Sequence, residues 1–500
     1  MRLRDRALSS TLRASRRHTV RVTSIIGIAA MANIAFGMIR MKIVAIVLGP
    51  IGIGMIGLLQ NLLNAAATIG GLNLGVAGAR QIVASESSNS DAATTVRQAV
   101  FVTTVAFAVG SGLVFWLFRD ALAGLLLQDH SRAREVGWLA IGVAATAGAG
   151  YQAAILSAGR RIGDIARISL LTAAAAALVG SFSIIWWKSG GIIPFILATP
   201  VAALAIGAIF VRRAVGRLEP RSTDTLTPHV ISLIKLGAIL TISIFVSLCG
   251  QLAVRTLVER RLGGTALGHF QAAWTITTVY LAFIFQAMAS DYLPRLTAAI
   301  EDRADVQKLV DGQAEVGFLL AAPILLIMIG AAPWLLSLFY SSEFVEATTL
   351  FRYQMMGDLL RLGVWPVALV LLAGGASHEY ALADITATVT LVAATAILLP
   401  VLGLSAPGLA YIGMNVVFGV MIMFLVYRRY FVVIGAHVFV MFAVLAASCA
   451  TIFAISSKVA LAGAIIGLAG ATVWASYAYL RLRVTDETPR NNKDPQEGAR

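Results

Sequence analysis

Long apolar segments recur along almost the whole chain, and this recurrence limits the fold more than any other feature. A helix that crosses a bilayer needs about 20 mostly apolar residues. The sequence predicts fourteen such spans, at 22–48, 52–79, 96–118, 137–158, 166–187, 191–211, 231–258, 266–290, 314–339, 348–373, 380–401, 405–427, 431–456 and 459–480. The second span could be broken near Gly70 and Gly71, because paired glycines weaken a helix.

The composition supports a lipid environment for these spans. Hydrophobic residues make up 58% of the 500 residues and charged residues 13%, whereas soluble domains carry roughly 25% charged residues. Several water-soluble domains could not be covered by so few polar side chains, so we predict an all-α polytopic membrane protein. The net charge of +14 therefore does not indicate a nucleic-acid partner.

The distribution of cations predicts the orientation of the chain. Most of the 39 Lys and Arg residues fall in loops on one side of the membrane if the N-terminus is cytoplasmic. Residues 1–21 then form a basic cytoplasmic tail, and the C-terminus is cytoplasmic too.

Two glycine-rich segments reveal an internal repeat. Leu48–Gly54 reads LGPIGIG and Leu262–Gly268 reads LGGTALG, with 214 positions between matched residues. A second pair, 156–159 and 372–375, matches at almost the same spacing. Six spans per repeat predict two lobes that run in the same sense. The expected organisation is an N-lobe at 22–211, a cytoplasmic linker at 212–230, a C-lobe at 231–427, two extra helices at 428–484 and a disordered tail at 485–500.

Cations inside the predicted spans are the main candidate site residues, since a charge at mid-membrane is costly unless it faces water or a partner. Asn33 and Arg40 share one face of the first span, and Gln251 and Arg255 share one face of the seventh. Position 255 matches position 41 in the repeat, so both lobes project a cation. The predicted spans carry further polar candidates: Gln60, Asn64, Arg352 and Arg361.

We interpret these side chains as the lining of a water-filled cavity between the lobes that attracts an anion, because two or more arginines can hold a phosphate. The alternative is that the arginines reach an interface or form structural pairs, as Asp358 and Arg361 would at i, i+3 spacing.

Carboxylates are scarce in the spans, and the first six contain none. Asp358 and Asp384 could couple transport to a proton or sodium gradient, or they could be structural. The sequence contains no His/Cys metal-ligand spacing and no set of nucleophile and base, so we expect no metal, no other cofactor and no enzymatic activity.

Three segments resemble a known family. The run from Arg21 to Pro50, then Gly54–Gln60, then Gly78–Ile82 resembles the opening of Wzx-type O-antigen translocases, which belong to the multidrug/oligosaccharidyl-lipid/polysaccharide (MOP) exporter superfamily. The resemblance implies two six-helix lobes arranged in a V around a central cavity. In the related lipid II flippases the first helix carries two cavity arginines six residues apart; Arg40 matches the second, and Ile34 stands at the first.

The resemblance also implies a function and a location. It predicts a flippase that moves undecaprenyl-pyrophosphate-linked oligosaccharide, such as an O-antigen or another polysaccharide unit for lipopolysaccharide, from the inner to the outer leaflet of the bacterial inner membrane by alternating access. The expected partners are this lipid-linked oligosaccharide, membrane lipids and other polysaccharide-assembly membrane proteins. The alternative on the same fold is a cation-coupled antiporter for drugs or other small molecules, which would need carboxylates in the cavity. A membrane scaffold that transports nothing is a third reading.

Overall fold

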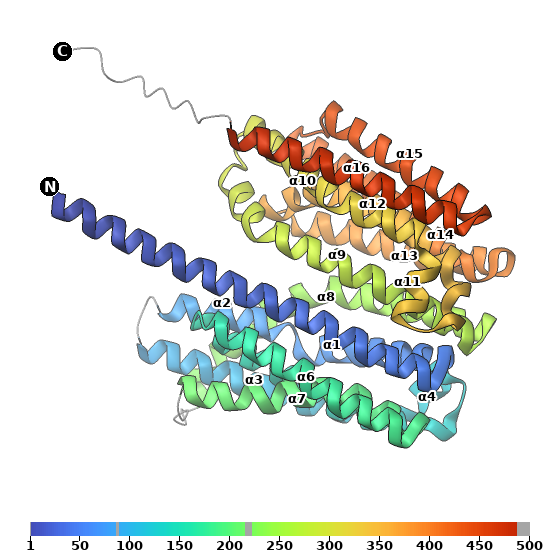
Figure 1. Cartoon of the computed structure of the whole chain (residues 1–500). Helices are drawn as coiled ribbons and strands as arrows, with labels where there is room; N and C mark the ends of the chain where they lie inside the picture. Colours follow the sequence, from blue (N-terminus) through green and yellow to red (C-terminus); the bar gives the residue numbers. More distant parts are fainter. Residues whose placement is uncertain (1, 87–89, 216–222, 488–500) are drawn as a thin grey trace, which may run out of the picture. The chain divides into compact units, whose positions relative to one another are not determined.

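A computed structural model describes residues 2–86, 90–215 and 223–487 of the chain (Figure 1). Within these ranges the regular elements are α-helices and short 3-10 helices, and no strand occurs. The predicted all-α membrane fold is therefore confirmed.

Sixteen α-helices are present in the described ranges. Their bounds are α1 Arg2–Gly71, α2 Leu74–Glu86, α3 Ser90–Leu117, α4 Arg119–Leu127, α5 Ala133–Ala158, α6 Ile162–Trp187, α7 Ile192–Val215, α8 Thr223–Leu262, α9 Gly264–Ala298, α10 Arg303–Gly330, α11 Ala332–Phe339, α12 Thr348–Ala373, α13 Ser377–Leu402, α14 Ala406–Tyr430, α15 Ala436–Lys458 and α16 Ala460–Glu487.

Ten segments of the described chain are long and apolar enough to cross a membrane, or up to eleven if a bent pair in α9 counts as one span. Three of these segments, Ala30–Ser85, Ile162–Ala214 and Ser377–Tyr430, are 53 to 56 residues long, which is enough for two crossings each. The segments are compatible with fourteen crossings, and that number stays a prediction.

Two breaks divide the first 86 residues. Gly49 has a φ of 61° inside α1, a conformation that glycine adopts without steric cost, and it separates the first two predicted spans. The second break lies at Leu72 and Asn73, whose φ values are 41° and 46°. It confirms the expected interruption near Gly70 and Gly71, because α1 ends at Gly71.

The chain forms two compact units. Unit 1 comprises Met1–Ala272, Leu336–Ala347 and Thr388–Pro407, and unit 2 comprises Ala273–Leu335, Thr348–Ala387 and Gly408–Arg500. The predicted lobe boundaries remain predictions. Residues 216–222 of the predicted linker and 488–500 of the predicted tail lie outside the described residues, and α16 extends to Glu487.

Unit 1 is organised around α5. This helix packs against α1, α2, α3 and α7, while α6 packs against α1 and α7. The centre of α5 is rich in glycine and alanine, including Gly142, Gly148 and Gly150. Small side chains let helix backbones approach closely in a membrane, and they also leave room for the cavities described below.

The two repeat motifs cross each other inside unit 1. A methyl group added at Gly54 would lie 2.8 Å from the backbone nitrogen of Gly268, and one added at Gly268 would lie 1.9 Å from the carbonyl oxygen of Pro50. Gly54 and Gly268 are matched positions of the repeat. Gly57 and Gln271, another matched pair, are also in contact, since a methyl group at Gly57 would lie 2.2 Å from the Gln271 side chain. Equivalent segments therefore meet in a close, approximately two-fold crossing.

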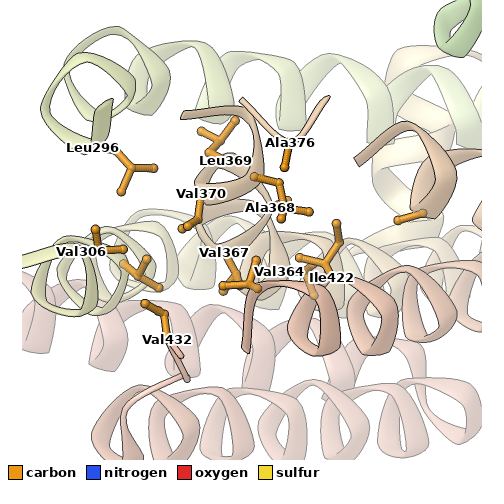
Figure 2. Close-up of a cluster of buried hydrophobic side chains, with 14 of the residues drawn as sticks. Leu296, Val306, Val364, Val367, Ala368, Leu369, Val370, Ala376, Ile422 and Val432 are labelled. Atoms are coloured by element: carbon orange, nitrogen blue, oxygen red, sulfur yellow. The ribbon is translucent and has the colours of Figure 1, made fainter. Parts of the chain in front are cut away.

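The core of unit 2 is a cluster of buried aliphatic side chains (Figure 2). Val364, Val367 and Val370 of α12 lie at its centre, with Val306 from α10 and Ile422 from α14. The two C-terminal helices, α15 and α16, pack on α10. A glycine pair in α16 makes the closest approach, because methyl groups added at Gly463 or Gly467 would collide with unit 2 neighbours.

Candidate functional site

A large cavity lies in unit 1, beside the second helix break. It has a volume of about 620 Å³ and is bounded by α1, α2, α5 and α8. This volume falls within the range of roughly 300–1,000 Å³ that is typical of ligand pockets. Its polar lining side chains are Asn64, Thr68, Asn73, Arg80, Thr146 and Ser157.

The lining of this cavity is mostly apolar, and it carries neutral polar side chains and one cation. Arg80 is exposed to the cavity, and its lining contains no Asp or Glu. In membrane transporters, interrupted helices commonly lie where substrate binds, since backbone that leaves the helix needs a polar surrounding. Hydroxyl and amide groups around a guanidinium suit a ligand that combines phosphate with sugar hydroxyls.

Two of the predicted polar residues meet at this cavity. The Nε2 atom of Gln60 lies 3.4 Å from the Oδ1 atom of Asn64, and Asn64 lines the cavity while Gln60 does not. The Thr68 hydroxyl donates to the Asn64 carbonyl oxygen at 2.7 Å. Of the predicted polar residues in the second span, Asn64 therefore lines the cavity, and Gln60 lies next to it.

Arg40 is held by α7. Its Nη1 donates to the Thr199 hydroxyl oxygen at 2.7 Å and its Nη2 to the Phe195 carbonyl oxygen at 2.9 Å. The guanidinium lies 3.8 Å from the centre of the Phe195 ring, and its buried Nε has no hydrogen-bond partner. The charge is therefore held by neutral groups, which leaves it able to attract an anion.

Asn33 lies two turns before Arg40 and donates to the Ser169 hydroxyl at 2.7 Å. Asn33 and Thr199 line a second cavity of about 330 Å³ between α1, α5, α6 and α7. Thr172 also lines it, and its buried hydroxyl has no partner. Asn33 and Arg40 therefore connect α1 to two neighbouring helices, α6 and α7.

Arg255 lies in α8 with only 3% of its surface exposed. Its Nε donates to Oε1 of Gln271 at 3.0 Å, and its Nη1 to the Gln251 carbonyl oxygen at 3.1 Å. Arg40 and Arg255 are both in unit 1, and they bind different helices, α7 and α9. Arg40 is half-buried and Arg255 is buried, and their convergence on one ligand stays a prediction.

Asp358 is fully buried in unit 2. Its Oδ2 accepts from the hydroxyl of Tyr280 in α9 and its Oδ1 from the hydroxyl of Tyr411 in α14, both at 2.8 Å. The Arg361 guanidinium also hydrogen-bonds Tyr411, while part of the Arg361 residue is exposed. Asp384 is half-buried in α13.

Arg352 occupies a different place on the same helix. It is 3% exposed, and it donates from Nε to the Ile329 carbonyl oxygen at 3.1 Å and from Nη2 to the Ser456 carbonyl oxygen at 3.3 Å. Both carbonyls belong to the last turn of a helix, α10 and α15, where backbone oxygens lack partners within the helix. The contacts give Arg352 a structural role, as the cap of two helix ends.

Sequence reasoning missed Arg80 as a site residue. The second predicted span ends at 79, so Arg80 falls just outside it and is not among the candidate residues. The glycine pair Gly70 and Gly71 is the sequence feature that could have identified Arg80. A new helix, α2, begins after this break, and Arg80 lies on α2 and lines the cavity.

Comparison with known proteins agrees with this architecture. Residues 43–349, well over half of the chain, match a family described as polysaccharide biosynthesis protein. The lipid III flippases of Escherichia coli (strain K12) and Shigella flexneri are each 22% identical to the chain over 417 residues, which cover 80% of this chain and 96% of each relative.

Solved structures share the fold at low identity. The lipid II flippase MurJ in an inward closed conformation matches with a TM-score of 0.71 and 11% identity, over 92% of this chain and 99% of that one. An inward-facing MATE family multidrug resistance transporter of the MOP superfamily matches with a TM-score of 0.65 and 12% identity, over the same shares. The MOP-type fold expected from the resemblance is confirmed, and the chain belongs to the polysaccharide biosynthesis protein family.

Proposed function

We propose that this chain is a flippase for a lipid-linked oligosaccharide. It would move an undecaprenyl-pyrophosphate-linked glycan from the inner to the outer leaflet of a bacterial inner membrane by alternating access, without covalent chemistry. The observation that carries the proposal is the 620 Å³ cavity of unit 1, whose lining combines hydroxyl and amide side chains with Arg80 and contains no carboxylate.

The residues divide the recognition of such a substrate between them. Arg80 and Arg40 would attract the pyrophosphate, because hydrogen bonds from a guanidinium to a phosphate are stronger than those between neutral groups. Asn64, Thr68 and Ser157 would bind sugar hydroxyls, since amide and hydroxyl groups both donate and accept. The match to lipid III flippases over most of the chain supports a lipid-linked substrate.

Coupling to an ion gradient is a second part of the proposal. Asp358 is the best-placed carboxylate, because it is buried in the membrane unit and hydrogen-bonded to helices α9 and α14. Taking up or releasing a proton there would change the number of hydrogen bonds that Asp358 accepts, and with it the packing of three helices.

The alternative, an antiporter for cationic drugs, has less support. The MATE transporters share the fold at 12–15% identity. At this identity the likeness does not indicate that this chain transports the same substrates. A cationic drug would need a carboxylate to replace its hydration, and the lining of the cavity supplies none.

Reconstituted proteoliposomes would test the proposal directly. We expect the wild-type protein to translocate a fluorescent undecaprenyl-pyrophosphate oligosaccharide, and Arg80→Gln and Arg40→Gln each to slow it about tenfold, the effect of losing a charged hydrogen bond. Lys188→Gln is the matched control, because Lys188 follows α6 away from the cavities. Wild-type rates in both arginine variants, or transport of a cationic dye in place of the lipid, would refute the proposal.

A further inference from the structure

The outer face of unit 1 carries a groove that neither the cavity nor the transport proposal uses. It lies between α3 and α7, with α5 as its floor, and has a volume of about 530 Å³. Helices α3 and α7 each pack on α5. The floor contains Ala144 and Gly148, whose small side chains leave the space between the walls unfilled.

The walls of the groove face hydrocarbon. Phe101, Val105 and Val109 of α3 line it, and they are 43%, 44% and 63% exposed, which in a membrane-spanning helix means contact with lipid. These residues extend over eight positions, or about 12 Å of helix. One leaflet of the hydrocarbon core is about 15 Å thick, so the apolar wall has nearly the depth of a single leaflet.

One end of the groove is cationic. Arg212 lines it from the last turn of α7, is exposed, and has no ion-pair partner among the described residues. It lies eight positions, about 12 Å, beyond Leu204, whose carbonyl is fixed to the floor by Gln152 at 2.9 Å. An apolar channel of leaflet depth that ends at a guanidinium matches the profile of an anionic lipid.

We propose that this groove binds an anionic glycerophospholipid, with one acyl chain along α3 and α5 and the phosphate at Arg212. A phosphodiester headgroup carries a single negative charge, which Arg212, the cation of the described lining, can neutralise. The site is separate from the 620 Å³ cavity, whose lining residues it does not share.

Native mass spectrometry of the purified full-length protein tests the proposal without any transport assay. Phosphatidylglycerol and phosphatidylethanolamine with the same acyl chains serve as probes, with undecaprenyl phosphate as a third. We expect phosphatidylglycerol to bind more tightly than phosphatidylethanolamine. Arg212→Gln should weaken phosphatidylglycerol about fivefold, as expected for one cation near a headgroup, and leave phosphatidylethanolamine unchanged.

A second pair of variants tests the groove itself. Ala208→Trp fills the groove and should weaken both phospholipids, whereas Ile209→Trp, on the neighbouring exposed position that does not line it, should not. Lys188→Gln controls for loss of any one cation, and a thermal melt confirms that each variant is folded.

Equal binding by Ala208→Trp and Ile209→Trp would overturn the site. Equal loss in Arg212→Gln and Lys188→Gln would overturn the headgroup position, and preferential binding of undecaprenyl phosphate would overturn the assignment to a phospholipid. None of these outcomes depends on whether the protein flips a lipid-linked oligosaccharide.

Discussion

Asp358 shows how one side chain can combine a packing role with a functional one. It accepts hydrogen bonds from Tyr280 and Tyr411, and Arg361 and Cys449 are further titratable groups around this network. The Asp358 carboxylate thus has two neutral donors on neighbouring helices and a guanidinium nearby. Protonation would turn one of the two acceptor oxygens into a hydroxyl group, so the hydrogen bond with one tyrosine would have to reverse its direction or break.

At this scale we predict the effect of Asp358→Asn. Asparagine keeps the shape and one acceptor oxygen but cannot bind a proton, so acceleration of flipping by an imposed pH gradient should disappear. Unfolding free energy should fall by about 1–3 kcal/mol, the cost of one unsatisfied buried polar group. Asp384→Asn provides the comparison in the same proteoliposome assay. If both variants keep the full response to the gradient, coupling through an embedded carboxylate is wrong.

Among the elements, the crossing of α1 and α9 depends most strictly on residue size. Gly268 has no room for a methyl group because the Pro50 carbonyl oxygen would lie 1.9 Å away. Gly37, on the same α1 helix, has open space around its Cα. Both residues are helical, so helix propensity affects them equally and only the contact differs.

We therefore expect Gly268→Ala to lower the unfolding midpoint strongly and Gly37→Ala to leave it unchanged or raise it. Overpacking typically costs about 1–3 kcal/mol, whereas replacing an open helical glycine with alanine gains up to about 1 kcal/mol. Thermal unfolding of the two purified variants in the same detergent gives the measurement. Similar midpoints would show that the crossing is looser than its distances indicate.

The comparison of sequence with structure is most instructive for these elements. Helix positions were predictable, because an apolar stretch of bilayer length and a glycine pair such as Gly70 and Gly71 act locally. The partners of Arg352 and the exposure of Arg80 to a cavity were not predictable. Both depend on which distant helices pack together, and an arginine that caps two helix ends has the same sequence signature as one that lines a pore.

On the scale of the whole molecule, the two C-terminal helices α15 and α16 are part of the core of unit 2. Arg352 connects the ends of α10 and α15, and Gly463 and Gly467 bring α16 against α10. These contacts between helix ends account for a buried arginine in a membrane-spanning helix without a role in substrate binding.

The prediction at this scale uses Cys449, which is fully buried in α15. In a Cys249→Ser background, Arg352→Met should expose Cys449 to maleimide at least about tenfold faster, because two helix-end carbonyls lose their donors. Arg361→Met on the same helix is the control and should label at the parental rate. Unchanged labelling in Arg352→Met would show that α15 is held by apolar packing alone.

The glycine crossing in unit 1 has a consequence for the history of the chain. Gly54 and Gly268 are matched positions of a duplicated sequence, and each contacts the other's segment. A contact between identical surfaces of two copies is what a symmetric homodimer makes. An ancestor one repeat long would have met its own copy at the residue now numbered 54, so duplication and fusion would have preserved an interface that already existed.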